Sequence, residues 1–159
     1  MSSEIDERQA QPTFGSHCHP ACIVCGTQNK GSMRLAFEDW EDGGVKATFA
    51  CDAGYQGYPG RLHGGVIAML LDAAMTHCLF ARQIRAVTAR LSIRYRLPVE
   101  LGKKATVQAR ITRETRPLFG LYAEIVQAGQ IRAAAEAKFL EESSQALSEP
   151  AGIGGMNDS

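Results

Sequence analysis

Hydrophobic and polar residues alternate along most of the chain, a pattern typical of β-strands with one buried face. Two alternating segments, residues 33–38 and 45–50, are separated by Asp42-Gly43-Gly44 and predict a hairpin. Four further alternating segments cover residues 87–97, 104–111, 121–125 and 131–139. Turn residues separate these four at Pro98 to Gly102, at Pro117 and at Ala128-Gly129. The pattern therefore predicts an antiparallel sheet of about six strands.

One long apolar segment, residues 62–81, interrupts this alternation and predicts a helix of about 18 residues. Its hydrophobic residues leave no polar face, so we expect it to be buried on all sides. Its only formal charge is Asp72, which would cost about 2.5–3.5 kcal/mol at the centre of a membrane span, so no membrane insertion is expected. The fold class is α+β: a curved antiparallel sheet wrapped around one long central helix. Such a unit leaves apolar surface uncovered, which favours dimerisation.

Length and charge limit the possibilities further. The chain has 159 residues, which corresponds to one domain, expected over residues 17–141. Residues 1–16 are expected to form a flexible N-terminal arm and residues 142–159 a disordered C-terminal tail. Seventeen basic and seventeen acidic residues give no net charge, which argues against nucleic-acid binding. The polar first residues and the odd number of cysteines, five, indicate a reducing, cytoplasmic location.

Residues typical of a binding site open the predicted helix, in the segment Tyr55-Gln56-Gly57-Tyr58-Pro59-Gly60-Arg61-Leu62-His63-Gly64-Gly65. Gly64 and Gly65 place unpaired N–H groups at a helix N-terminus, where negative charge is favoured. Asp72 follows two turns later, and a carboxylate in the core is costly unless it is paired. Tight packing of the glycines and an acceptor role for the carboxylate are the structural alternatives. Their combination on one helix favours a functional site.

This region resembles a known family. The segments YQGYPGRLHGGVIAMLLDAAM and VTARLSIRYRLPVELG are similar to hotdog-fold acyl-CoA thioesterases of the phenylacetyl-CoA thioesterase type, as is CIVCGTQNKGSMRLAF near the start. The resemblance covers residues 22–140, and its most specific element is His-Gly-Gly with an aspartate nine residues after the histidine. The fold of that family, a long helix wrapped by an antiparallel sheet, agrees with the strand order predicted above.

The resemblance implies roles for individual residues. Asp72 corresponds to the catalytic carboxylate, and Gly64 to the residue whose N–H polarises the thioester carbonyl. His63 corresponds to the histidine of the motif, and Thr88 to a residue that helps to hold the attacking water. Some members carry an asparagine that contacts the thioester where this chain has Gly57, so Gln56 is the candidate to replace that contact.

The arginines of the following strand are candidates for binding the phosphates of coenzyme A. Arg90, Arg94 and Arg96 share the polar face of that strand with Thr88. A guanidinium group suits bidentate contact with phosphate. The alternative is a solvated strand face with ion pairs to Glu124 or Glu136.

The spacing of Gly64 and Asp72 has a consequence for assembly. Eight residues correspond to about 12 Å along a helix. An oxyanion donor and a base must both reach one carbonyl group, each at roughly 3 Å, so one helix cannot supply both. We therefore expect a homodimer, possibly a dimer of dimers, in which antiparallel helices contribute Gly64 from one subunit and Asp72 from the other. Asp72 would act as a general base or as a nucleophile.

The expected function is hydrolysis of an acyl-CoA thioester to a free acid and coenzyme A, without a cofactor. The alternative is a non-catalytic module that binds acyl-CoA or another hydrophobic ligand on the same fold, which would not need Asp72. A hotdog dehydratase would require a catalytic histidine near the helix, and neither His63 nor His77 matches that arrangement. The sequence leaves the acyl group open.

A cluster of cysteine and histidine precedes the first strand, in the segment His17-Cys18-His19-Pro20-Ala21-Cys22-Ile23-Val24-Cys25. Its spacing is that of zinc ligands, with Cys18, Cys22 and Cys25 as candidates. No second pair of cysteines completes a typical structural zinc site, and a thioredoxin-like context for a redox pair is absent. A tight turn with free thiols is favoured, and a structural zinc ion is the less favoured alternative.

Overall fold

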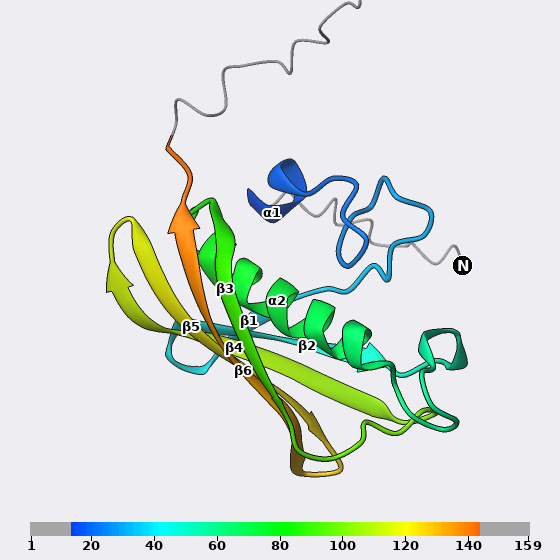
Figure 1. Ribbon diagram of the computed structural model, residues 1–159. Coiled ribbons are helices and arrows are strands. Elements are labelled where there is room, and N and C mark those ends of the chain that lie inside the picture. Colours follow the sequence, from blue (N-terminus) through cyan, green and yellow to red (C-terminus); the bar gives the residue numbers. More distant parts are fainter. Residues whose placement is uncertain (1–13, 144–159) are drawn as a thin grey trace, which may run out of the picture.

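The computed structural model describes residues 14–143, and its centre is the long helix α2, Gly64–Phe80, lying against an antiparallel sheet (Figure 1). The strands are β1 (Glu38–Trp40), β2 (Gly44–Ala50), β3 (Ala86–Tyr95), β4 (Lys104–Thr115), β5 (Leu118–Gln127) and β6 (Gln130–Glu141). A short helix, α1 (Phe14–Cys18), and two 3-10 turns, η1 (Glu41–Gly43) and η2 (Ala53–Tyr55), complete the elements of the described chain. The segment that contains α1 lies on the side of α2 opposite the sheet.

The strand order is β1-β2-β4-β5-β6-β3, with every neighbouring pair antiparallel. The predicted fold class is thereby confirmed: a curved sheet of six strands with one long helix. The inner face of the sheet is filled by large side chains such as Phe119 and Phe139, which are fully buried. Leu70, Leu71 and Met75 of α2 complete this core, and burying each one contributes about 1.5–3 kcal/mol. The core fixes the helix on the sheet.

The predicted N-terminal hairpin is present, but the predicted bounds of its first strand are wrong. Residues 33–37 are not in the sheet, and β1 pairs with β2 only from Glu38 to Trp40. Met33 and Leu35 instead donate backbone hydrogen bonds to Ile23 and Val24, at 2.8 and 2.9 Å. Alternation showed that this segment is extended but could not show which segment it pairs with.

The expectation that α2 is buried on all sides is also wrong. Ala68, Met69 and Asp72 are only half-buried and Gly65 is exposed, and these positions follow the i, i+3, i+4, i+7 spacing of one helix face. This face of α2 is therefore incompletely covered by the described part of its own chain.

Strand β3 contains an irregularity that matters for the site. Thr88 pairs with Phe139 of β6 and Arg90 pairs with Lys138, so Ala89 is an extra residue without a partner. Such a β-bulge reverses the alternation of side chains along the strand. Thr88 therefore lies on the inner face with Phe139, whereas the sequence placed it on the polar face with Arg90.

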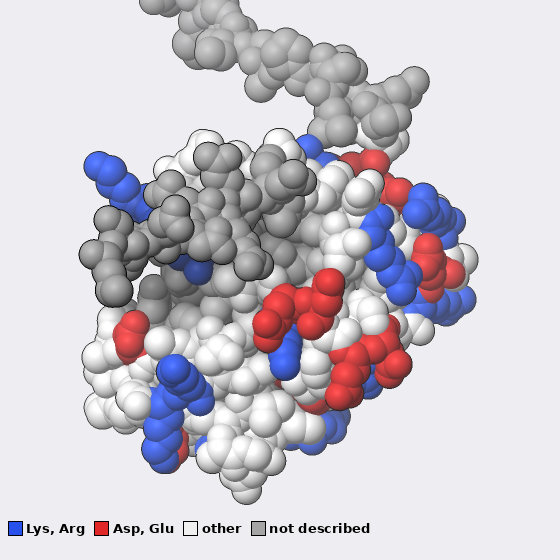
Figure 2. All heavy atoms as spheres, turned by 180° about the vertical axis from the view of Figure 1, so that it is seen from behind, with Lys and Arg blue, Asp and Glu red and all other residues white. Residues whose placement is uncertain are grey.

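The described residues include the whole of the expected domain, residues 17–141, and a few residues on either side. Residues 14–16 belong to α1, and Glu142 forms an ion pair with Arg85 at 2.6 Å. The rest of the expected arm and tail, residues 1–13 and 144–159, lies outside the described residues. None of the helices in residues 14–143 has the length and apolar character needed to span a membrane. On the face shown in Figure 2, acidic and basic side chains are intermingled, in keeping with the balanced net charge.

Candidate active site

The N-terminus of α2 is capped by His63, whose extended backbone precedes the helix. The Nδ1 atom of its imidazole accepts a hydrogen bond from the Gly65 N–H at 2.8 Å. A Cβ atom at Gly65 would lie 3.1 Å from Nδ1, so a larger residue there would require the imidazole to shift by a few tenths of an ångström. The Gly65 N–H, a candidate for substrate binding from the sequence, is therefore already engaged by His63.

Gly64 keeps its N–H group available. Within residues 14–143, no group accepts a hydrogen bond from this N–H. The carbonyl oxygen of Gly64 accepts a hydrogen bond from the Tyr95 hydroxyl at 2.8 Å, which ties the first turn of α2 to the end of β3. A free N–H at the positive end of a 17-residue helix is a suitable donor to a carbonyl oxygen that gains negative charge.

The loop before the helix is held by its own hydrogen bonds. The Gln56 side-chain oxygen accepts from the Gly60 N–H at 3.1 Å, and the Gly57 N–H donates to the Arg61 carbonyl at 3.0 Å. A Cβ atom at Gly57 would lie 3.1 Å from the Cα atom of His63, so a side chain there would displace the helix cap. The Gln56 oxygen therefore stabilises this loop, and its amide nitrogen is the part of the side chain left for a ligand.

A cavity of about 830 Å³ opens at the start of α2. It is lined by Gln56, Gly57, Tyr58, Arg61, Leu62, His63, Gly64, Ile67, Tyr95, Arg96, Leu97, Pro98 and Val99. This lining includes two arginines and no carboxylate, so an anionic ligand is favoured there. Asp72 is not part of the lining, in agreement with the distance of about 12 Å that eight residues of one continuous helix impose.

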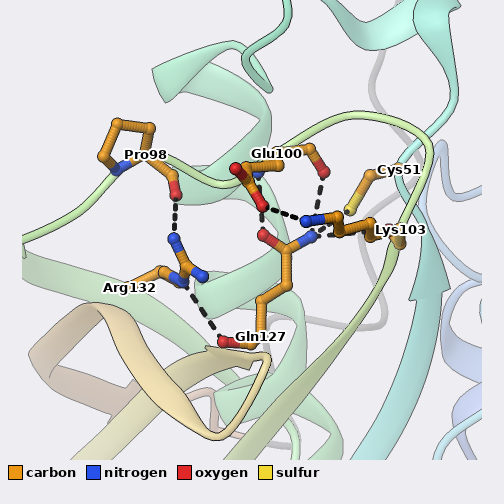
Figure 3. Close-up of polar contacts among 6 residues, drawn as sticks. All are labelled: Cys51, Pro98, Glu100, Lys103, Gln127 and Arg132. Carbon is orange, nitrogen blue, oxygen red and sulfur yellow. Dashed lines mark hydrogen bonds and ion pairs between the residues drawn. The ribbon is translucent and has the colours of Figure 1, made fainter.

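One wall of this cavity is fixed by a buried polar network (Figure 3). The side chain of Gln127, 2% exposed, accepts from the Glu100 N–H at 2.8 Å and donates to the Glu100 carbonyl at 2.9 Å. Arg132 donates to the Pro98 carbonyl at 2.9 Å and to the Gln127 carbonyl at 3.2 Å. These bonds hold the loop between β3 and β4, which supplies Leu97, Pro98 and Val99 to the wall.

Asp72 and Thr88 form the second polar centre. The Thr88 hydroxyl donates to the Asp72 carboxylate Oδ1 at 2.6 Å, and this short contact is possible because the β-bulge turns Thr88 toward α2. The carboxylate is half-buried rather than enclosed in the core. The charge of Asp72 also reaches the N-terminal segment: burial and Arg85 lower the pKa of His19, and Asp72 partly opposes them.

The three candidate arginines do not form one group. Arg96 lines the cavity at the start of α2. Arg90 borders a different cavity, of about 690 Å³, on the outer face of the sheet, and Arg94 borders neither of the two. None of the three forms an ion pair with a carboxylate of residues 14–143, so the alternative of pairs to Glu124 or Glu136 is not realised there.

His77 and the Cys25 thiol lack the properties of catalytic groups. His77 stacks on Phe37 at 4.2 Å, and burial lowers its pKa to about 4, so it is a neutral core residue at pH 7. Burial and the neighbouring Cys22 raise the pKa of the Cys25 thiol to about 12, so it remains protonated without a metal. All five cysteines are free thiols. The side chains of Cys22 and Cys25 lie close to that of His19, whereas Cys18 is not part of this cluster.

Three residues of the site escaped the sequence prediction. Tyr95 was not among the candidate residues, although its hydroxyl donates a hydrogen bond to the Gly64 carbonyl. Gln127 lies at the end of β5 and Arg132 at the start of β6, and both are distant in sequence from the loop that they hold. No signal in the sequence alone indicates these long-range contacts.

Known proteins share this fold and this part of the sequence. A family model described as the thioesterase superfamily matches residues 59–134, from the loop before α2 into β6. The thioesterase superfamily protein RHA08564 superimposes with a TM-score of 0.70 and 30% identity, over 74% of this chain and 62% of that protein. The fold and the helix-start site thus define a hotdog-fold protein. Residues 59–134, a little under half of the chain, are similar to the thioesterase superfamily.

Two further similarities are narrower. The acyl-coenzyme A thioesterase THEM4 of Rattus norvegicus is 38% identical over 65 residues, which are 40% of this chain and 28% of THEM4. The chain therefore matches little more than a quarter of the length of that relative. Smu.793 from Streptococcus mutans UA159, whose structure contains acetyl CoA, shares the fold at a TM-score of 0.64 and 24% identity, over 68% of this chain and 88% of smu.793.

Proposed function

We propose that the chain is a hydrolase of acyl-CoA thioesters that releases a free acid and coenzyme A. The observation that carries this proposal is the Gly64 N–H at the positive end of α2, which has no acceptor within residues 14–143 and lies beside a cavity of about 830 Å³. A thioester carbonyl placed against this N–H would be polarised, and its oxyanion would be stabilised. The name of the THEM4 relative and the acetyl CoA bound to smu.793 support this class of substrate.

The chemistry requires a carboxylate as well as the donor. Asp72, oriented by Thr88, removes a proton from a water molecule whose oxygen attacks the thioester carbon. The tetrahedral oxyanion accepts from Gly64, the carbon–sulfur bond breaks, and the thiolate of coenzyme A leaves and takes up a proton. Direct attack by Asp72, with an anhydride that water then hydrolyses, uses the same residues.

The site is assembled from two subunits. Gly64 and Asp72 of one helix are too far apart to act on one carbonyl group, so each site combines Gly64 of one subunit with Asp72 of another. Strand β3 lies at the edge of the sheet and exposes 47% of Val87 and 54% of Tyr95, which suits pairing with a second copy. The half-buried face of α2 that carries Asp72 would be covered by the partner. Val87 of β3, Leu140 of β6 and Leu118 of β5 are paired across neighbouring strands and are all exposed. A dimer of dimers would cover this apolar row.

The anionic part of coenzyme A would bind at the arginines of the cavity. Arg61 and Arg96 both line it, and guanidinium groups form charge-assisted hydrogen bonds with phosphate. Gln56 and Gly57 line the same cavity and would contact the thioester end of the substrate. Arg90 and Arg94 lie on the outer face of the sheet and are weaker candidates for phosphate binding.

The test is the release of free thiol from a panel of acyl-CoA thioesters with short, medium, long and aromatic acyl groups. Hydrolysis of at least one member is expected, and a Gly64→Pro or Asp72→Asn variant should lack it. In addition, Arg96→Ala should raise KM in a salt-sensitive manner with little change in kcat, whereas Arg90→Ala serves as the matched control. Tight binding of acyl-CoA without any turnover would instead identify a binding module.

A further inference from the structure

The segment after α1 places three metal-ligating side chains together. One ligand atom from each of His19, Cys22 and Cys25 lies within 4.8 Å of the other two. Each of these residues is half-buried. Tetrahedral zinc, with Zn–S bonds of about 2.3 Å and Zn–N bonds of about 2.0 Å, holds its ligand atoms about 3.5 Å apart. Side-chain movements of about 1 Å would therefore close a metal site.

The backbone between the two cysteines has the form of a metal-binding turn. The Val24 N–H donates to the Cys22 sulfur at 3.4 Å, and the Gly26 N–H donates to the Cys22 carbonyl at 2.8 Å. A Cβ atom at Gly26 would lie 2.3 Å from the Cys22 nitrogen, so only glycine fits. Backbone donors to a sulfur atom stabilise its thiolate form and orient it as a ligand.

The third ligand is held from a different direction. The imidazole of His19 packs edge-on against Phe80, the last residue of α2, with ring centroids 4.9 Å apart. This contact orients the ring and connects the cysteine turn to the helix. Cys18, which the spacing had offered as a ligand, ends α1 and is not in the cluster.

We propose that His19, Cys22 and Cys25 bind one zinc ion, with a water molecule as the fourth ligand. Two thiolates and an imidazole are typical zinc ligands and are unsuited to magnesium or calcium. A disulfide between Cys22 and Cys25 would leave the presence of His19 unexplained. The bound ion ties the N-terminal segment to the end of α2, so its loss lowers stability before it affects the chemistry at Gly64 and Asp72.

The experiment uses the full chain, purified without chelators and kept reduced with a phosphine. Titration with Co²⁺ should give one equivalent bound, with thiolate-to-cobalt charge-transfer and visible ligand-field bands that Zn²⁺ removes. Cys22→Ser and Cys25→Ser should abolish these bands, and His19→Ala should weaken binding at least tenfold. Cys18→Ser and His17→Ala are the matched controls, since Cys18 directly precedes the ligand His19 and His17 lies two residues before it. Both variants should bind Co²⁺ as the original chain does.

A second measurement avoids the variants. Alkylation followed by mass spectrometry should show that Zn²⁺ protects Cys22 and Cys25, but not Cys18, and that Zn²⁺ raises the melting temperature. The proposal is overturned if cobalt gives no charge-transfer band, if Cys18→Ser is as damaging as Cys22→Ser, or if the metal-free chain forms a Cys22–Cys25 disulfide under these reducing conditions.

Discussion

The Thr88 hydroxyl donates a hydrogen bond of 2.6 Å to the Asp72 carboxylate, across the junction between β3 and α2. The contact exists because Ala89 is an extra residue in β3, which turns Thr88 to the inner face of the sheet. A carboxylate that accepts a short hydrogen bond from a threonine has one fixed oxygen and one left to act. The geometry thereby orients Asp72 toward a reactant at the half-covered face of α2.

Removing this hydrogen bond should impair catalysis without unfolding the protein. A hydrogen bond to a charged group is worth about 1.5–3 kcal/mol, so Thr88→Val should lower kcat about 10- to 100-fold. Thr88→Ser keeps the hydroxyl and should retain most of the activity. Steady-state kinetics of both variants, with thermal unfolding as the control, test the role. Equal activity of the valine and serine variants would show that the hydroxyl is unimportant.

The role of the Gly64 N–H can be tested by removing only that group. Proline is well tolerated at the first position of a helix, and His63 has the extended backbone, φ −61° and ψ 134°, that a following proline requires. A Cβ atom at position 64 would contact only the Tyr95 ring, at an ordinary 3.6 Å. Gly64→Pro should lower kcat about 100- to 1000-fold, the cost of losing one oxyanion donor.

Gly64→Ala is the matched control for this prediction, since it adds a Cβ atom but keeps the N–H. It should retain substantial activity, and circular dichroism should show both variants folded. If Gly64→Pro is folded and keeps more than about a tenth of kcat, the N–H supplies less than about 1.4 kcal/mol of barrier lowering and is not the main donor.

The sequence predicted the helix and five of the six strands, because period-2 alternation and a long apolar segment are local signals. It misplaced the first strand and the exposed face of α2, since both depend on what packs against them. Thr88 was named by resemblance but assigned to the wrong face, because a bulge leaves no mark in the alternation. The roles of Gln127 and Arg132 depend on a distant loop, and no local pattern contains them.

The burial of His77 predicts a loss of stability in acid. Burial lowers its pKa from 6.5 to about 4, so the folded state favours the neutral ring. The contribution of His77 to stability is present above pH 6.5 and is lost as the pH falls from 6.5 toward 4, by at most about 3 kcal/mol. No described residue is a hydrogen-bond partner of its buried Nε2 atom, so replacement by an apolar ring should be tolerated.

His77→Phe should retain the stacking on Phe37 and remove the titration. Urea unfolding at pH 7 and at pH 5 should therefore show that this variant loses less stability than the original chain on acidification. His17→Gln, a change at an exposed histidine, is the control and should behave as the original chain does. An identical pH dependence for His77→Phe would mean that His77 is protonated as easily in the folded as in the unfolded state.

Replacing the carboxylate should abolish hydrolysis while leaving the fold intact. Asp72→Asn removes the charge and keeps the shape, and the Thr88 hydroxyl can still donate to the amide oxygen. Substrate binding should persist, because Gly64, Arg61 and Arg96 of the cavity are unchanged. Thiol release and equilibrium binding of a coenzyme A thioester measure the two properties separately. Retention of more than about a tenth of kcat would exclude Asp72 as the base or nucleophile.

Sharing of the site between subunits gives the most discriminating prediction. Asp72→Asn and Gly64→Pro homodimers should each be inactive, but a heterodimer of the two contains one intact site, with Gly64 from the first chain and Asp72 from the second. Random subunit exchange should therefore restore about a quarter of the original activity, since half of the dimers then carry one intact site of two. Co-expression with two affinity tags isolates the heterodimer, and light scattering measures its mass. A monomer in solution, or a heterodimer without activity, would show that the two groups do not act together across an interface.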